Sequence, residues 1–398
     1  MADDPPAPVG AANLFVRHPA NPILTADSWP YAVNTVFNPG ATMTPDGQTV
    51  LVCRVEDRRG VSHLTVARSH DGVSDWRVDP RPLLAGDEND PINRWGVEDP
   101  RVTRVDAMDG WIIAYTAYGP AGPCVALALT RDFETVEQLG VVMPPEDKNA
   151  CLLPRKVDGN YILFHRPTSS NSHRADVWLS RSSDLRAWSN PEPVLAARAG
   201  TWWDSVRIGM GPPPLETEHG WLGIYHGVRN TVAGPAYRAG LVLLDLADPS
   251  VVKHRSPEWV LSPATDYERQ GDVPNVVFGT ANPVVDGQVY LYYGGADRVI
   301  DATDSLVCPG FIDTHVHSGH RALHKLLTDG GRKDLFGQPY MDVTIARDGT
   351  KIQGYPNYLT SEEAKTDPGI ALHAAFTVAE LLRNGVTTFV ELGGHVMV

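Results

Sequence analysis

A strand pattern that recurs five times constrains the fold of this chain more than any other feature. Each unit has a residue followed by proline, a turn that contains glycine, and then an alternating, aromatic-rich run. Such alternation between turns is typical of antiparallel strands. The units follow one another at intervals of roughly 60 residues, which indicates an internal repeat. The dipeptides are Asn38-Pro39, Asp99-Pro100, Leu153-Pro154, Gly211-Pro212 and Asn282-Pro283, and the runs span residues 49–57, 111–118, 161–167, 221–228 and 289–297.

A third strand is predicted in each of the first four units, over residues 63–71, 124–132, 177–185 and 237–246. Small antiparallel sheets that repeat along a chain pack face to face in a propeller, which leaves only short edges exposed. The 36 glycines and 33 prolines suit many turns, and 42% hydrophobic residues with ten tryptophans suffice for a large core. We therefore predict an all-β fold, a five-bladed β-propeller over residues 1–300.

The pattern changes near Ile300, where the repeat stops. An extended apolar run ends in His315-Val316-His317, and period-two alternation places both imidazoles on one side of a strand, as a pair of metal ligands would require. The segment Ala371–Arg383 has a helical pattern and Val386–Leu392 resembles a buried strand. We expect a C-terminal α/β fragment over residues 301–398.

The sequence from Pro309 to His317 resembles the opening motif of the amidohydrolase superfamily, which implies a fragment of an incomplete (β/α) barrel. The resemblance covers only the first part of such a barrel, and members take their other metal ligands from later strands. Two histidines bind metal weakly, because closed sites need three or four protein ligands. We therefore expect no metal site here and no independent functional domain. Whether the fusion near residue 300 is natural stays open.

Charge and cysteine usage narrow the class of protein. The net charge of −14 argues against a nucleic-acid surface, which needs an excess of Lys and Arg. The four cysteines lie far apart, which favours free thiols in a reducing compartment. The N-terminus is acidic and Pro-rich, unlike a signal peptide, and no apolar run is long enough to span a bilayer. We expect a cytoplasmic protein without membrane partners; its oligomeric state, a homo-oligomer included, stays open.

Asp99 is the first candidate for chemistry. Among the five Pro-led dipeptides it is the single carboxylic acid, and it lies between Glu98 and Arg101. In an extended segment Glu98 would point away from Asp99, so we expect Glu98 to be a structural or orienting carboxylate. The structural alternative for Asp99 is an Asp-Pro turn at the start of a strand.

Seven separated segments then resemble glycoside hydrolase family 130, the β-mannoside phosphorylases and related β-mannosidases. The resemblance covers residues 13–300. The segments are Val36–Ala41, Arg54–Asp57, Gly96–Arg101, His165–Pro167, Ile208–Pro214, Ile224–Val228 and Tyr292–Asp297.

The resemblance implies a phosphorylase that transfers a mannosyl unit from a β-mannoside or mannooligosaccharide to inorganic phosphate, without a cofactor. Asp99 would be the proton donor, in some members through a sugar hydroxyl. A dianionic phosphate is best held by guanidinium groups and other cations. Positions that match the phosphate contacts are Lys148, Arg166, Arg207 and His226, and those that match the mannosyl site are Asn38, Arg54, Arg101, Tyr237 and Asp297.

Two positions depart from the family pattern. Arg207 stands where phosphorylases usually carry lysine, and Arg155 where they usually carry glutamate, which leaves acceptor choice open. Trp202 and Trp203 are either acceptor-stacking residues or core residues. Three other functions stay open: a β-mannosidase of the same fold, a non-catalytic carbohydrate-binding propeller and, furthest from the motifs, a metal-dependent amidohydrolase.

Overall fold

The computed structural model of the chain describes residues 14–168, 175–232, 234–285 and 287–296, together with the backbone of two strands at 311–316 and 386–391. The chain folds as two compact units, Met1–Ile300 and Asp301–Val398. The described part of the first unit is nearly all β-structure, and the α-helix described there, α1 (Asp266–Arg269), has four residues. The prediction of an all-β fold for this unit is confirmed.

The first sheet contains nine strands in two halves. One half has the order β1 (Thr35–Met43), β2 (Thr49–Glu56) and β3 (Ser62–Ser69), with β4 (Arg77–Val78) and β5 (Leu84–Ala85) paired to β3. The other half has the order β6 (Gly96–Val105), β7 (Gly110–Gly119), β8 (Gly122–Thr130) and β9 (Glu137–Met143). A parallel bridge from Ser62 to Gly96 joins them, so each half is a small antiparallel sheet.

The next two sheets repeat this antiparallel order. One consists of β10 (Asp147–Leu152), β11 (Tyr161–Pro167), β12 (Val177–Ser182) and β13 (Ser189–Leu195). The other consists of β14 (Arg207–Met210), β16 (Gly220–Thr231), β17 (Gly234–Leu244) and β18 (Val252–Arg255), with β15 (Leu215–Thr217) paired to β16.

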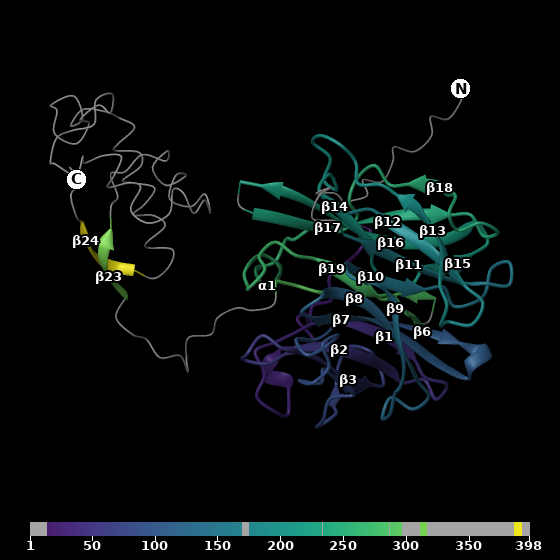
Figure 1. The fold of residues 1–398 in the computed structure, drawn as a ribbon, viewed down its shortest axis with the longest axis horizontal. Helices are drawn as coiled ribbons and strands as arrows, with labels where there is room; N and C mark the ends of the chain where they lie inside the picture. Colours follow the sequence, from purple (N-terminus) through teal and green to yellow (C-terminus); the bar gives the residue numbers. More distant parts are fainter. Residues whose placement is uncertain are drawn as a thin grey trace. The chain divides into compact units, whose positions relative to one another are not determined.

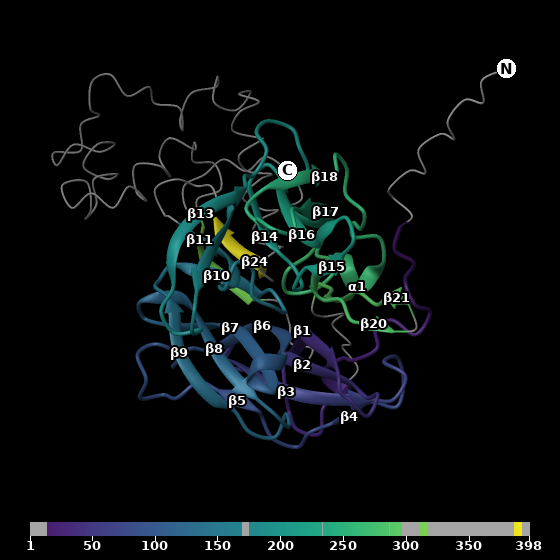
Figure 2. The same cartoon turned by 90° about the vertical axis from the view of Figure 1, so that its right-hand side faces the viewer.

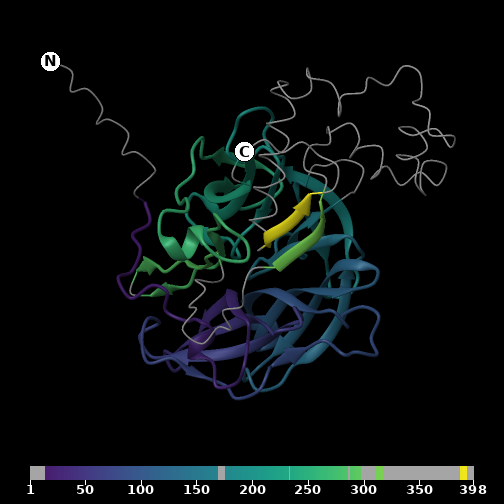
Figure 3. The same cartoon turned by 90° about the vertical axis from the view of Figure 1, so that its left-hand side faces the viewer.

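The described part of the first unit ends with two short pairs, β19 (Phe278–Ala281) with β22 (Tyr292–Gly294) and β20 (Val284–Val285) with β21 (Gln288–Val289). Two short 3₁₀-helices, η2 (Ala26–Ser28) and η3 (Asp106–Met108), lie in connections. The sheets of this unit, whose strands are labelled in Figure 1, follow one another in chain order around a common centre, as the colours show in the two turned views (Figures 2 and 3).

The predicted second and third strands agree with β2, β3, β7, β8, β11, β12, β16 and β17 to within a few residues. In the last unit the described part of the predicted run at 289–297 contains the short strand β22 and the last residue of β21. The sequence did not predict the fourth, outer strands β9 and β13. Their residues are mostly exposed or half-buried on both faces, so they lack the apolar alternation that identifies a strand.

The second half of the first sheet is buried on both faces. Successive side chains of a strand point to opposite sides. Ile113 of β7 packs in a cluster with Leu64 of β3, whereas its neighbour Ile112 packs with Leu152 of β10. Burial of one such isoleucine contributes about 1.5 to 3 kcal/mol. Face-to-face packing of successive sheets therefore places their first strands side by side, and β6 contacts both β1 and β10.

Bulges interrupt three of these first strands at matching places. The register shifts between Phe37 and Gly40 in β1, between Glu98 and Arg101 in β6, and between Lys148 and Cys151 in β10. The residues inside the bulges have left-handed φ angles, which Asn and Asp tolerate better than other non-glycine residues. They are Asn38 at 46°, Asp99 at 49° and Asn149 at 56°.

The bulges correct the predicted equivalence of the five Pro-led dipeptides. Pro39 and Pro100 lie inside strands, but Pro154 follows the end of β10, and the third unit's counterpart of Asp99 is Asn149. Pro154 and Pro283 instead line a common cavity of about 310 Å³. Asn38-Pro39 and Asp99-Pro100 are structurally equivalent, whereas Leu153-Pro154 matches them in sequence only.

The remaining predictions on the fold have mixed outcomes. Cys53, Cys124 and Cys151 are free and buried, as predicted, and Cys308 lies outside the described residues. In the second unit, β23 (Phe311–Val316) pairs in parallel with β24 (Val386–Glu391), where the two strands were predicted. The predicted helix at 371–383 and His317 lie outside the described residues, so the barrel fragment stays a prediction. No helix in the described part of the chain is long and apolar enough to cross a membrane.

Candidate active site

A cluster of buried and half-buried polar side chains lies near the bulged ends of the first strands. Three of the described sheets contribute polar side chains to it, the first through β1, β2 and β6, the second through β10 and β11, and the third through β14, β16 and β17. The members are Asn38 of β1, Arg54 of β2, Glu98, Asp99 and Arg101 of β6, Lys148 and Asn149 of β10, Arg166 of β11, Arg207 of β14, His226 of β16, and Tyr237 of β17.

Asp99 is held by two donors from the other half of the first sheet. Asn38 Nδ2 donates to Asp99 Oδ1 at 2.8 Å and Arg54 Nη1 donates to the same oxygen at 3.0 Å. Asn38 is itself fixed by a close approach, since a Cβ added to Gly294 would lie 2.0 Å from Asn38 Oδ1. Both contacts reach Oδ1, so neither donor engages Oδ2.

Glu98 lies on the same side as Asp99, and the expectation that it points away was wrong. Arg54 Nη2 donates to Glu98 Oε1 at 3.2 Å while Nη1 of the same guanidinium contacts Asp99. Lys148 Nζ lies 3.8 Å from Glu98 Oε2. The physical reason is the bulge, because a left-handed residue breaks the period-two alternation on which the expectation rested.

The cations control the protonation of Asp99. Burial by itself would raise the pKa of the Asp99 carboxyl, but Arg54, Arg101 and Lys148 together hold that pKa well below its usual range. Burial is the main cause that lowers the pKa of Lys148, which the nearby carboxylates partly offset. In the protein alone Asp99 is therefore ionised at neutral pH, and a role as proton donor requires the surrounding positive charge to be neutralised first.

Arg101 is fully buried and engages backbone carbonyls. Its Nε donates to the carbonyl oxygen of Gly211 at 2.8 Å and its Nη1 to the carbonyl oxygen of Asp99 at 2.8 Å. These bonds tie the bulge of β6 to the segment after β14. Arg101 was predicted to contact the mannosyl unit, and its described contacts show that it also supports the backbone that carries Asp99.

The predicted phosphate residues form the other half of the cluster. Arg166 Nη1 lies 3.5 Å from His226 Nε2, and Arg207 Nη2 donates to the Tyr237 hydroxyl at 2.9 Å. Burial, assisted by Arg207, lowers the pKa of Arg166 to about 10. Burial and the neighbouring arginines also hold the pKa of His226 well below its ordinary value, so its imidazole is neutral.

Several nitrogen atoms of this group are buried without a hydrogen-bond partner among the described residues. Unpaired buried donors of this kind are uncommon, since each costs about 1 to 3 kcal/mol. A neutral imidazole nitrogen can serve as donor or acceptor. The atoms are Arg101 Nη2, Arg166 Nε, Arg207 Nε and His226 Nδ1.

Asn149 and Phe278 belong to the cluster although the sequence did not single them out. Asn149 Nδ2 lies 3.4 Å from His226 Nε2, and a Cβ on Gly209 would lie 2.5 Å from the same imidazole ring. The Phe278 ring centroid is 4.5 Å from that of His226. Asn149 could have been found as a third Asn or Asp residue at a strand start, whereas Phe278 carries no such signal.

Other candidates lie apart from the cluster. Asp297 lies outside the described residues. Trp203 is buried against Tyr225 with a centroid distance of 5.4 Å, so it is a core residue and cannot stack on an acceptor sugar. Trp202 is exposed and lies 4.1 Å below the Arg198 guanidinium. Arg155 pairs with Glu216 at the surface, at 2.5 Å, and makes no described contact with the cluster.

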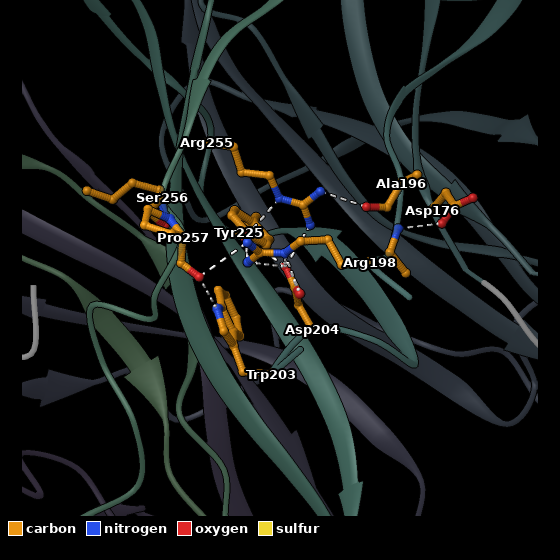
Figure 4. A network of polar contacts seen from close by, with 11 residues as sticks. Asp176, Ala196, Arg198, Trp203, Asp204, Tyr225, Arg255, Ser256 and Pro257 are labelled. Carbon is orange, nitrogen blue, oxygen red and sulfur yellow. Dashed lines mark hydrogen bonds and ion pairs between the residues drawn. The ribbon is translucent and has the colours of Figure 1, made fainter. Parts of the chain in front are cut away.

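A second buried ionic network anchors the segment that leads into Arg207 (Figure 4). The Asp204 side chain is fully buried and accepts hydrogen bonds from Arg198 Nε at 2.8 Å, Arg255 Nη2 at 2.7 Å and the Tyr225 hydroxyl at 2.9 Å. Asp204 precedes Arg207 by three residues. The network therefore fixes the backbone immediately before β14, on which the placement of the Arg207 guanidinium depends.

No group of three or more His, Cys, Asp or Glu side chains in the described ranges is arranged to hold a metal ion. What the cluster can do follows from its charges. It places the carboxyl groups of Asp99 and Glu98 beside arginine and lysine side chains, which is suited to a dianion next to a proton-transfer group.

The chain is similar to known mannoside phosphorylases in sequence and in fold. A relative from Thermoanaerobacter sp. (strain X514), a 1,2-beta-oligomannan phosphorylase, is 37% identical over 243 residues, which cover 60% of this chain and 77% of that protein. The solved structure of a beta-1,2-mannobiose phosphorylase from Listeria innocua is 28% identical, with a TM-score of 0.65, over 70% of this chain and 93% of that one.

The C-terminal part has a separate, partial similarity. A 5-methylthioadenosine/S-adenosylhomocysteine deaminase from Acetivibrio thermocellus is 33% identical over 101 residues, which cover 25% of this chain and only 19% of that protein. Residues 16–305, by contrast, match a family model described as beta-1,4-mannooligosaccharide phosphorylase. Because this match spans most of the chain, the protein belongs to glycoside hydrolase family 130.

Proposed function

We propose that this protein is a β-mannoside phosphorylase, which transfers a mannosyl unit from a β-mannoside or β-mannooligosaccharide to inorganic phosphate and releases mannose 1-phosphate with inversion at the anomeric carbon. The observation that carries the proposal is the buried set of unpaired donors beside Asp99. Arg166 Nε and Arg207 Nε are buried without described partners, and each belongs to a guanidinium group suited to a phosphate oxygen.

The proposed reaction is a single displacement. A phosphate oxygen attacks the anomeric carbon from the face opposite the leaving group, and the bond from that carbon to the glycosidic oxygen breaks. The leaving oxygen receives a proton that comes from the Asp99 carboxyl, directly or through a sugar hydroxyl. A phosphorylase needs only this one carboxyl group, since phosphate replaces the water that an inverting hydrolase must activate with a second.

The depressed pKa of Asp99 makes phosphate binding part of the acid chemistry. Arg54, Arg101 and Lys148 keep the free carboxyl ionised. A bound phosphate adds negative charge beside these cations and raises the pKa of Asp99, because like charges disfavour ionisation. The proton donor therefore forms when the attacking group is in place. The residues proposed to hold the mannosyl unit are Asn38, Arg54, Arg101, Tyr237 and Asp297.

We further propose that residues 1–300 form a five-bladed propeller that carries the whole activity, with inorganic phosphate as co-substrate and no cofactor. Residues 301–398 are proposed to contribute no catalytic group, because a two-histidine fragment lacks the ligands of a closed metal site. The linkage is left undecided, since the matching family model is described by a β-1,4 substrate and the Thermoanaerobacter relative by a β-1,2 substrate.

The test is product analysis with the full chain. Purified protein is incubated with β-1,2- and β-1,4-mannobiose, with and without inorganic phosphate, and the products are resolved by mass. We expect mannose 1-phosphate only when phosphate is present. Equal release of free mannose without phosphate would overturn the proposal in favour of a hydrolase, and sugar binding without any turnover would leave a binding propeller.

A further inference from the structure

We propose that Trp95 and Tyr118 form a carbohydrate platform that binds sugar units of a mannan chain beyond those held at Asp99. This inference rests on the proposed function for its choice of sugar. The two side chains are not part of the buried cluster, and nothing in the proposed reaction uses them. Trp95 directly precedes β6, the strand that carries Asp99, and Tyr118 lies on β7, which pairs with β6.

The two rings make an exposed aromatic pair. Trp95 is 42% exposed and Tyr118 is 36% exposed, and their ring centroids lie 5.4 Å apart at an interplanar angle of 66°. The Arg94 guanidinium lies 5.8 Å from the Trp95 ring centroid. Large apolar rings that stay exposed beside a polar donor often mark a ligand surface, and sugars offer an apolar face together with hydroxyl groups.

The backbone under the pair is rigidly packed. Trp95 N donates to the Tyr118 carbonyl oxygen at 2.9 Å, which joins the loop before β6 to the end of β7. Asn93 is buried, its Oδ1 accepts a hydrogen bond from Asp87 N at 2.9 Å, and its carbonyl oxygen accepts one from Gly96 N at 2.8 Å. The platform is therefore ordered before any ligand binds, which lowers the entropic cost of binding.

Two glycines make this packing feasible. A Cβ on Gly119 would lie 2.1 Å from the Pro91 carbonyl oxygen, and a Cβ on Gly86 would lie 2.2 Å from the Asn93 carbonyl oxygen. A side chain at Gly119 would push the loop away from the end of β7, and one at Gly86 would displace Asn93 within the loop. The close approach of the loop to the strand end thus depends on these glycines, and the approach is what exposes the Trp95 ring beside Tyr118.

Register places the platform next to the proposed catalytic group. Gly96 pairs with Tyr118 and Glu98 with Thr116, so the pair lies at the end of β6 that carries Asp99. Trp95 precedes Asp99 by four residues, which limits the distance between their α-carbons to roughly 14 Å. A mannan chain of several units that leaves the site at Asp99 can therefore reach the rings.

The test compares substrates of different length in variants of the full chain. We expect Trp95→Ala to raise KM for a β-mannotetraose roughly tenfold, as one lost aromatic contact would. The KM for the matching mannobiose and the kcat for both should change less than twofold. Trp95→Phe, which keeps an aromatic ring, should recover most of the loss, and Val251→Ala, at a distant exposed residue, should behave as the wild type.

Three results would overturn the platform: equal losses on both substrates, no loss on either, or a change in oligomeric state of Trp95→Ala, which would assign the rings to a subunit interface. Should the wild type turn over neither substrate, the proposed function fails, and the platform is tested separately by direct binding. Tighter binding of mannotetraose than of mannobiose, lost in Trp95→Ala, would then still support it, and equal binding of the two would reject it.

Discussion

Asn38 donates its side-chain amide to Asp99 at 2.8 Å, and both residues occupy left-handed bulges of neighbouring first strands. A regular strand would turn alternate side chains away from the common centre. The bulges instead aim both side chains at the same point, and the Asn38 amide favours the ionised carboxylate, as Arg54 does. In the protein without bound phosphate Asp99 is therefore an ionised carboxylate, and added negative charge nearby would favour its protonation.

Replacement of Asp99 by asparagine removes the proposed proton donor. We expect Asp99→Asn to lower kcat by roughly 10² to 10⁴, the usual contribution of a general acid. Sugar binding should persist, because the amide fills the same volume. Steady-state phosphorolysis and calorimetric titration with mannobiose measure the two effects. Asp57→Asn, at a carboxylate that pairs with Arg59 outside the cluster, is the matched control. Full activity of Asp99→Asn would remove Asp99 from the mechanism.

Replacement of Arg207 is expected to change the dependence of the rate on phosphate concentration. We expect Arg207→Ala to raise KM for phosphate roughly 10-fold to 100-fold, because a hydrogen bond to a charged group contributes about 1.5 to 3 kcal/mol. Arg207→Lys keeps the charge but loses the fork that reaches Tyr237, so its effect should be smaller. Initial rates at varied phosphate measure both.

The neighbouring Arg238→Ala is the control for Arg207, since Arg238 lies on the same strand as Tyr237 but contacts Ser262 and Trp259 away from the cluster. Its KM for phosphate should equal that of the wild type. An unchanged phosphate KM in Arg207→Ala would show that this guanidinium does not hold phosphate.

The sequence predicts the strands better than the site. β2, β7 and β11 could be predicted because their alternation reflects burial of successive faces. That Glu98 and Asp99 point to the same side could not be predicted, because a bulge is a one-residue irregularity that leaves the apolar pattern unchanged. Arg101 shows the same limit, since its partner, the Gly211 carbonyl, lies 110 residues away along the chain.

The family motifs identified residues whose contacts cannot be predicted from a local sequence pattern. Arg166 and His226 are 60 residues apart and approach to 3.5 Å only because their sheets share one centre. Asn149 was missed because the third unit was aligned on Pro154, although its bulge lies five residues earlier. The position of Asn149 depends on how β10 pairs with its partner strand, and this register cannot be read from the order of residues alone.

The Asp204 network should be a major source of stability. Asp204→Asn leaves two arginines without their buried counter-charge, and loss of one partner of a buried ion pair costs about 3 to 5 kcal/mol. Urea unfolding should show this decrease in the free energy of unfolding. Glu216→Gln removes the exposed pair with Arg155 and should cost less than about 1 kcal/mol. Similar decreases in the free energy of unfolding of the two variants would contradict the role of Asp204 as a buried counter-charge.

The neutral state of His226 makes stability depend on pH in a defined window. The folded pKa lies well below the ordinary value of 6.5, because burial and then Arg166, Arg101 and Arg207 disfavour the cation. Below pH 6.5 the unfolded chain binds a proton that the folded protein does not, so the free energy of unfolding decreases as the pH falls through 6.5.

Between pH 7.5 and 5.5 this single group should remove about 1.4 kcal/mol of stability, from an unfolded pKa of 6.5 and no proton bound in the folded state. His226→Gln cannot titrate, so its loss over the same interval should be smaller by that amount. Urea unfolding of both proteins at the two pH values gives the comparison. Equal losses would mean that His226 titrates alike in the folded and unfolded chains, and that its imidazole is not kept neutral by the arginines around it.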